Sequence, residues 1–155
     1  LLDKKNTSIS PVTEMMLYMT SRRQTVEEVI VPALEAGKIV LCDRFLDSTV
    51  VYQGYGLGLD RGMIGCLGDI ATEGLKPDMT ILLETPLKAA LRSIRSKDRI
   101  ESRPLSYHQR VKNGYMALAR KEPRRIKVVR LEERKEQTQE KIRGLVDSLL
   151  KSKRC

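Results

Sequence analysis

Several features that mark other classes of protein are absent from this sequence of 155 residues. No apolar run approaches the ~20 residues of a membrane-spanning helix, and we see no secretory segment at the start. Cys42, Cys66 and Cys155 are an odd number without Cys-x-x-Cys spacing, which argues against a disulfide framework and a zinc site. We therefore expect a cytoplasmic protein, in a reducing compartment, without a membrane partner.

Histidine is nearly missing, and charge is unevenly distributed. His108 stands alone, so a structural role is more probable for it than a place in a metal or catalytic site, where such groups cluster. Residues 1–91 hold 9 Lys/Arg against 12 Asp/Glu, whereas residues 92–155 hold 20 against 8. The basic half predicts an anionic partner, either nucleic acid or a phosphate-bearing small molecule; the alternative is a solvated helical surface.

Apolar periodicity predicts alternating helices and strands. Ser10-Pro11 is typical of a helix start, and the helix should end at Gly37. Short apolar runs predict buried strands at 38–42, 79–84 and 126–131. Helical patterns cover residues 64–71, 87–94, 111–119 and 142–149. This order predicts an α/β fold with a parallel sheet flanked by helices, in a single domain over residues 1–155.

Asp43-Arg44 comes directly after the predicted strand 38–42. Ligands of open parallel sheets bind beyond the carboxyl ends of the strands. A carboxylate there can orient Mg²⁺ in phosphoryl transfer, and an adjacent arginine can hold phosphate with its planar fork. The alternative is a structural Asp-Arg pair that caps the next helix.

Two further groups of residues could contact a nucleotide. Tyr18 and Arg22 are four residues apart on one helical face, so a ring and a guanidinium could hold a flat base together. Alternatively, Tyr18 belongs to the core and Arg22 to the solvated surface. The helix that follows Arg44 adds four polar or aromatic side chains, Ser48, Thr49, Tyr52 and Gln53.

Arginines recur every three or four residues across a segment of about 92–104, at Arg92, Arg95, Arg99 and Arg103. A nucleic-acid site would usually add stacking aromatics, but Tyr107 is the only one nearby, so nucleic acid is a less favoured partner. A lid that closes over phosphates explains the arginines equally well, since a transferred phosphoryl group needs positive neighbours.

Nearly the whole chain resembles the thymidylate kinase family. The resemblance begins with "TEMMLYMTSRRQTVEEVIVPALEAGKIVLCDRFLDSTVVYQGYGLGLD" and continues in order through "GLKPDMTILLETP", "DRIE" and "RVKNGYMALA". It implies a P-loop kinase-type fold and an enzyme that transfers the γ-phosphoryl group of ATP to dTMP with Mg²⁺, giving dTDP. It also implies a homodimer.

The resemblance assigns roles to the candidate residues. It implies that Tyr18 stacks on thymine and that Arg22 bonds an exocyclic oxygen of the base. Arg44 would hold the dTMP phosphate, while Asp43 would organise the metal and phosphates. Ser48, Thr49 and Gln53 would line the dTMP site, Tyr52 would favour deoxyribose, and Arg95 and Arg99 of the lid would reach the transferring phosphate.

The sequence departs from the family pattern at its start. Nothing matches the glycine-rich motif GxxxxGK[ST] that cradles ATP phosphates, so we expect the N-terminal strand and P-loop to be missing and this chain to be inactive as given. The lid is about two residues short, and Glu84 stands where the family usually has Asp. The alternative function is a non-catalytic nucleotide- or nucleic-acid-binding module; another nucleotide kinase fits Tyr18, Arg22 and Tyr52 less well.

Overall fold

The computed structural model describes residues 1–93 and 98–153, which fall into two compact units. Unit 1 comprises Leu1–Lys76 and Ser96–Tyr115, and unit 2 comprises Pro77–Arg95 and Met116–Cys155. Within the described ranges, no helix combines the length and the apolar character that crossing a membrane requires.

A long helical stretch opens unit 1. Helix α1 (Pro11–Thr25) continues through a π-helical segment, η1 (Val26–Ile30), into α2 (Val31–Glu35). Ser10 is the N-cap, and its Oγ accepts a hydrogen bond from the backbone N–H of Thr13 at 3.1 Å. Gly37, with φ +70°, ends the stretch in the left-handed conformation that glycine adopts without strain. The predicted helix from Pro11 to Gly37 is therefore confirmed.

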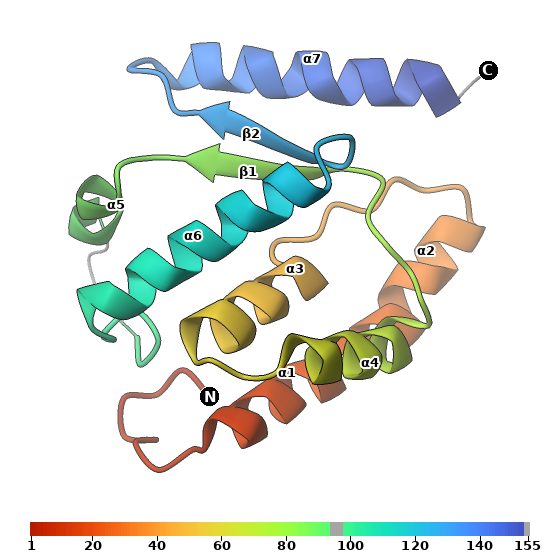
Figure 1. Ribbon diagram of the computed structural model, residues 1–155. Coiled ribbons are helices and arrows are strands. Elements are labelled where there is room, and N and C mark those ends of the chain that lie inside the picture. Colours follow the sequence, from red (N-terminus) through yellow and green to blue (C-terminus); the bar gives the residue numbers. More distant parts are fainter. Residues whose placement is uncertain (94–97, 154–155) are drawn as a thin grey trace. The chain divides into compact units, whose positions relative to one another are not determined.

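Three further helical segments complete the first part of unit 1: α3 (Leu46–Thr49), the π-helical η2 (Val50–Gly56) and α4 (Arg61–Thr72). In Figure 1, α4 lies beside α1. The core between them consists of buried side chains from both helices, namely Met15, Met19, Ile64 and Ala71. Burial of each large side chain stabilises the fold by roughly 1.5–3 kcal/mol, so this core fixes α1 relative to η2 and α4.

Helix α6 spans Leu105–Lys121, and its first part, residues 105–115, belongs to unit 1 and packs on η2 at very short range. A Cβ atom added at Gly114 would lie 2.7 Å from Cγ of Tyr55, and one added at Gly56 would lie 2.6 Å from Cε2 of Tyr107. Nε and Nη2 of Arg110 both donate to the carbonyl oxygen of Gly56, at 3.0 and 2.8 Å. Only glycine at these two positions lets the two segments come this close.

Unit 2 contains a parallel sheet with helices. Strands β1 (Thr80–Glu84) and β2 (Ile126–Arg130) pair in parallel, with Thr80 opposite Ile126 and Glu84 opposite Arg130. Helix α5 (Leu87–Ser93) follows β1, and α7 (Lys135–Lys153) packs on β2 (Figure 1). These elements confirm two of the three predicted strands and the predicted helix at 142–149. The predicted helix at 87–94 is confirmed as far as Ser93, and residue 94 lies outside the described residues.

The third predicted strand, 38–42, was wrong. This segment of unit 1 is irregular, and the side chains of Ile39 and Leu41 are 75% and 99% exposed. An apolar run forms a strand only where a neighbouring strand bonds its backbone N–H and C=O groups. In the part of the chain that the structure describes, the two strands pair with each other. Asp43-Arg44 therefore follows an irregular segment and not a strand.

Candidate nucleotide-binding site

Arg44 has an unusual backbone conformation at the centre of the candidate site. Its φ of +64° lies in the left-handed region, which costs a residue other than glycine roughly 1–2 kcal/mol. Its guanidinium lies over the ring of Tyr52, 5.0 Å from the centroid. Burial lowers the pKa of Arg44, but the interactions with Tyr52, Tyr115 and Asp43 together raise it above its ordinary value, so the group stays cationic. The conformation presents a fixed, exposed positive charge in unit 1.

Arg22 of α1 supports the segment that follows Arg44. Its Nη2 donates to the carbonyl oxygen of Phe45 at 3.2 Å, and its guanidinium lies 5.7 Å from the centroid of the Phe45 ring. Its Nη1 also lies 3.3 Å from Sδ of Met19. Burial lowers the pKa of Arg22. Arg22 is therefore a partly buried cation that joins α1 to the Asp43-Arg44-Phe45 turn, and it is not fully solvated.

Tyr18 is partly buried and lies one helical turn before Arg22. Burial raises the pKa of Tyr18, and the charges of Glu14, Arg99 and Arg44 also act on it. The contacts of Arg22 with Phe45 and of Arg44 with Tyr52 bring these side chains into one region of unit 1, and Tyr18 lies on the same helix as Arg22.

Of the other three predicted contacts from α3 and η2, Ser48 and Gln53 have hydrogen-bond partners in the protein, and Thr49 is buried. Oγ of Ser48 lies 2.8 Å from the hydroxyl of Tyr115. Thr49 and Gln53 are each only 2% exposed, and Nε2 of Gln53 donates to Oε1 of Glu14 at 2.8 Å. Thr49 and Gln53 are therefore interior side chains of unit 1, and their contacts with a nucleotide stay predictions.

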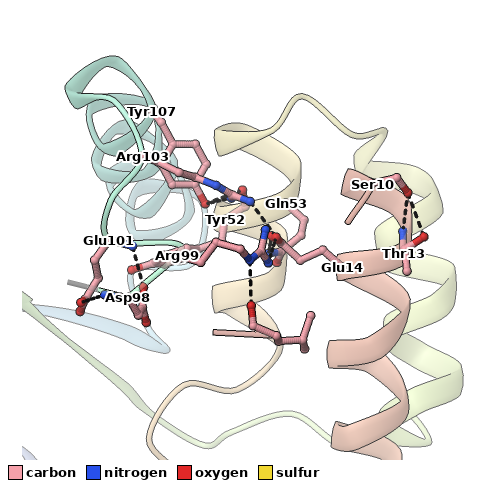
Figure 2. A network of polar contacts seen from close by, with 11 residues as sticks. Ser10, Thr13, Glu14, Tyr52, Gln53, Asp98, Arg99, Glu101, Arg103 and Tyr107 are labelled. Atoms are coloured by element: carbon pink, nitrogen blue, oxygen red, sulfur yellow. Dashed lines mark hydrogen bonds and ion pairs between the residues drawn. The ribbon is translucent and has the colours of Figure 1, made fainter. Parts of the chain in front are cut away.

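Glu14, which sequence reasoning missed, is the centre of a buried polar network (Figure 2). The side chain is wholly buried, and its Oε2 accepts hydrogen bonds from Nη2 of Arg99 at 2.5 Å and Nη2 of Arg103 at 2.7 Å. Burial raises the pKa of Glu14, but the hydrogen bonds from Gln53, Arg103 and Arg99 lower it more. No local signal marks this role in the sequence, since the partners of Glu14 lie 39 to 89 positions away.

Residues 98–103, at the end of the predicted lid, fold as a compact turn. The backbone N–H of Glu101 donates to Oδ1 of Asp98 at 2.7 Å, and the N–H of Asp98 donates back to Oε2 of Glu101 at 3.0 Å. This reciprocal capping explains the two acids of "DRIE". Nε of Arg99 donates to the carbonyl oxygen of Leu1 at 2.8 Å, besides its bond to Glu14. Arg95 lies outside the described residues, so the lid roles of Arg95 and Arg99 stay predictions.

Tyr107 links this turn to η2. Its hydroxyl accepts from Nη1 of Arg103 at 2.9 Å and donates to the carbonyl oxygen of Tyr52 at 3.3 Å (Figure 2). Burial raises the pKa of Tyr107 to about 12, so the hydroxyl stays protonated at neutral pH. His108 is buried next to it, with Nε2 3.2 Å from the carbonyl oxygen of Glu101, which is a structural contact.

The described carboxylates form no cluster of metal ligands: no group of three or more His, Cys, Asp or Glu side chains in residues 1–93 and 98–153 is arranged to hold an ion. Asp43 is exposed beside Arg44. A single exposed carboxylate does fit Mg²⁺ that takes most of its ligands from nucleotide phosphates and water.

Comparison with known proteins agrees with this geometry. The chain superimposes on the crystal structure of thymidylate kinase from Ehrlichia chaffeensis with a TM-score of 0.72 and 26% identity, over 92% of this chain and 68% of that one. The fold is therefore the α/β fold of P-loop kinases, with a parallel sheet flanked by helices.

Sequence comparison gives the family. The model of the thymidylate kinase family matches residues 1–142. The thymidylate kinase of Geotalea daltonii is 49% identical over 139 residues, covering 83% of this chain and 65% of that protein. The thymidylate kinase of Symbiobacterium thermophilum is 44% identical over 152 residues, covering 97% and 71%. The chain belongs to the thymidylate kinase family, and it spans about 65% of the length of several of these curated relatives.

Proposed function

We propose that this protein is a thymidylate kinase, which transfers the γ-phosphoryl group of ATP to dTMP, and that this chain carries the dTMP site. The observation that carries the proposal is the strained Arg44 over the ring of Tyr52, with Arg22 bonded to the adjacent Phe45 and with Tyr18 one helical turn before Arg22. A ring, two guanidiniums and a second ring are the groups that would recognise a base and a phosphate together.

In the proposed reaction, an oxygen of the dTMP phosphate attacks the γ-phosphorus of ATP, the bond to the β-phosphate oxygen breaks, and ADP leaves. Arg44 would hold the acceptor phosphate, and Tyr18 with Arg22 would hold thymine. Asp43 would hold the Mg²⁺ that ATP brings, and this ion would supply charge stabilisation of the transferred group. Arg95 and Arg99 would add positive charge from the lid.

The remaining family expectations belong to the same proposal: a cytoplasmic homodimer that uses ATP and dTMP. The alternative is a non-catalytic nucleotide- or nucleic-acid-binding module, which the basic C-terminal half would favour. The lack of a GxxxxGK[ST] motif in these 155 residues fits either function for the isolated chain.

Calorimetric titration of the chain with dTMP tests the proposal. We expect saturable binding of dTMP, and Arg44→Ala should weaken it at least tenfold, because a guanidinium–phosphate pair is typically worth about 1.5–3 kcal/mol. Arg23→Ala is the matched control, since Arg23 lies on α1 and pairs with Glu27 at 3.1 Å on the surface. Binding of an oligonucleotide in place of dTMP would favour the alternative.

A further inference from the structure

The ring of Tyr52 is held between two other tyrosines of unit 1. Tyr107 and Tyr115, both on α6, meet it with ring centroids at 6.3 and 6.2 Å and interplanar angles of 70° and 78°. These are edge-to-face contacts, the geometry that aromatic pairs favour because the positive edge of one ring meets the negative face of another. The plane of the Tyr52 ring is therefore fixed from α6.

The same ring locates the guanidinium of Arg44. That group lies 5.0 Å from the centroid of the Tyr52 ring, and the left-handed backbone conformation of Arg44 sets the direction of its Cα–Cβ bond. An exposed arginine otherwise samples many rotamers, and holding it in one of them reduces the entropy cost of binding an anion. A change in the Tyr52 ring plane would thus change where the positive charge lies.

Tyr115 is itself fixed at both ends. Its hydroxyl lies 2.8 Å from Oγ of Ser48 on α3, and it follows Gly114, whose close contact with Tyr55 seats α6 on η2. Burial raises the pKa of Tyr115 to about 12, so the hydroxyl remains neutral at physiological pH. Tyr107 also accepts a hydrogen bond from Arg103, so replacing it would disturb a second contact. Tyr115 is the simpler support of Tyr52 to test.

We infer that Tyr115 is a positioning residue for the phosphate-binding arginine: through the ring of Tyr52, it holds the guanidinium of Arg44 where a 5′-phosphate is bound. This inference rests on the proposed dTMP site. It predicts a specific pattern, because Tyr115 then contributes more to the affinity for the phosphate of the nucleotide than to the affinity for the nucleoside.

The test compares dTMP with thymidine in the full chain. Tyr115→Leu removes the ring edge, and we expect it to weaken dTMP binding about threefold to tenfold, as loss of an aromatic pair does. Thymidine binding should weaken less, so the dTMP/thymidine affinity ratio should fall. Tyr115→Phe keeps the edge and should retain the dTMP/thymidine affinity ratio of the unsubstituted chain. The ratio is the useful quantity, because loss of folded protein lowers binding of both ligands alike.

Asn113→Leu is the matched control on the same helix, since Asn113 is exposed and its side-chain oxygen accepts a hydrogen bond from Nε2 of Gln109 at 3.0 Å. The dTMP/thymidine affinity ratio of this variant should not change. If Tyr115→Leu does not fold, Tyr115→Met fills the space without a ring edge and should show the same selective loss. If the dTMP/thymidine affinity ratio is unchanged in the Leu or Met variant of Tyr115, the inference is wrong but the proposed function stands. Failure of the unsubstituted chain to bind dTMP overturns the proposed function, and the inference with it.

Discussion

Replacing Glu14 by glutamine should strongly destabilise unit 1. Glutamine has nearly the same volume as glutamate, so the substitution opens no cavity and removes one negative charge from a wholly buried position. Arg99 and Arg103, which both bond Oε2 in the native protein, are only 11% and 17% exposed. Without the carboxylate, these two largely buried guanidiniums would lose the negative charge that they share.

The magnitude follows from this geometry. Breaking a buried ion pair by neutralising one partner typically costs about 3–5 kcal/mol, because the remaining charge is left uncompensated. Partial exposure of the two arginines lets water solvate them after the change, which places the expected loss near the lower end. We therefore expect the free energy of unfolding of unit 1 to fall by about 3 kcal/mol.

Urea unfolding followed by tyrosine fluorescence measures this loss in unit 1 alone. All five tyrosines of the chain lie in unit 1, and the chain contains no tryptophan. Glu28→Gln is the matched control: Glu28 is exposed on η1, and surface changes of this kind usually stay within about 0.5 kcal/mol. A loss below about 1 kcal/mol for Glu14→Gln, the range of surface pairs, would refute the reasoning.

Three further outcomes are expected. The folded-state pKa of Glu14 is below its ordinary value of 4.5. The ionised carboxylate therefore stabilises the folded state fully above about pH 4.5, and this stabilisation is lost as the pH falls through the folded-state pKa. Urea titrations at pH 6 and pH 3 should show that the difference in free energy of unfolding between wild type and Glu14→Gln is smaller at pH 3. Gly114→Ala should lower the melting temperature although alanine has the better helix propensity, because the added Cβ would lie 2.7 Å from Cγ of Tyr55. Gly144→Ala on α7 is the control: nothing lies within 4 Å of the added Cβ, so the melting temperature should not fall. The isolated chain with ATP, Mg²⁺ and dTMP should release ADP only at background in a coupled assay, and turnover above about one per second would contradict this.

Local chemistry made much of the structure predictable. The Ser10 cap, the left-handed Gly37 and the apolar spacing between them encode a helix that needs no distant partner to be recognised. The strands at 80–84 and 126–130 are apolar, β-branched runs, and the helical patterns before and after them imply the parallel pairing that is observed. The candidate residues Tyr18, Arg22, Arg44 and Tyr52 were found from spacing and resemblance.

Tertiary structure decided what local patterns leave open. The run 38–42 has the composition of a buried strand, but a strand exists only through hydrogen bonds to a neighbour, and this property lies outside the segment itself. The same holds for Glu14, an ordinary first-turn acid by sequence, which becomes the centre of a network only because residues 39 to 89 positions away fold against it. Secondary structure is set mainly by neighbours in sequence. Burial and pairing of side chains depend on contacts with residues far away in the sequence, and local sequence patterns do not specify those residues.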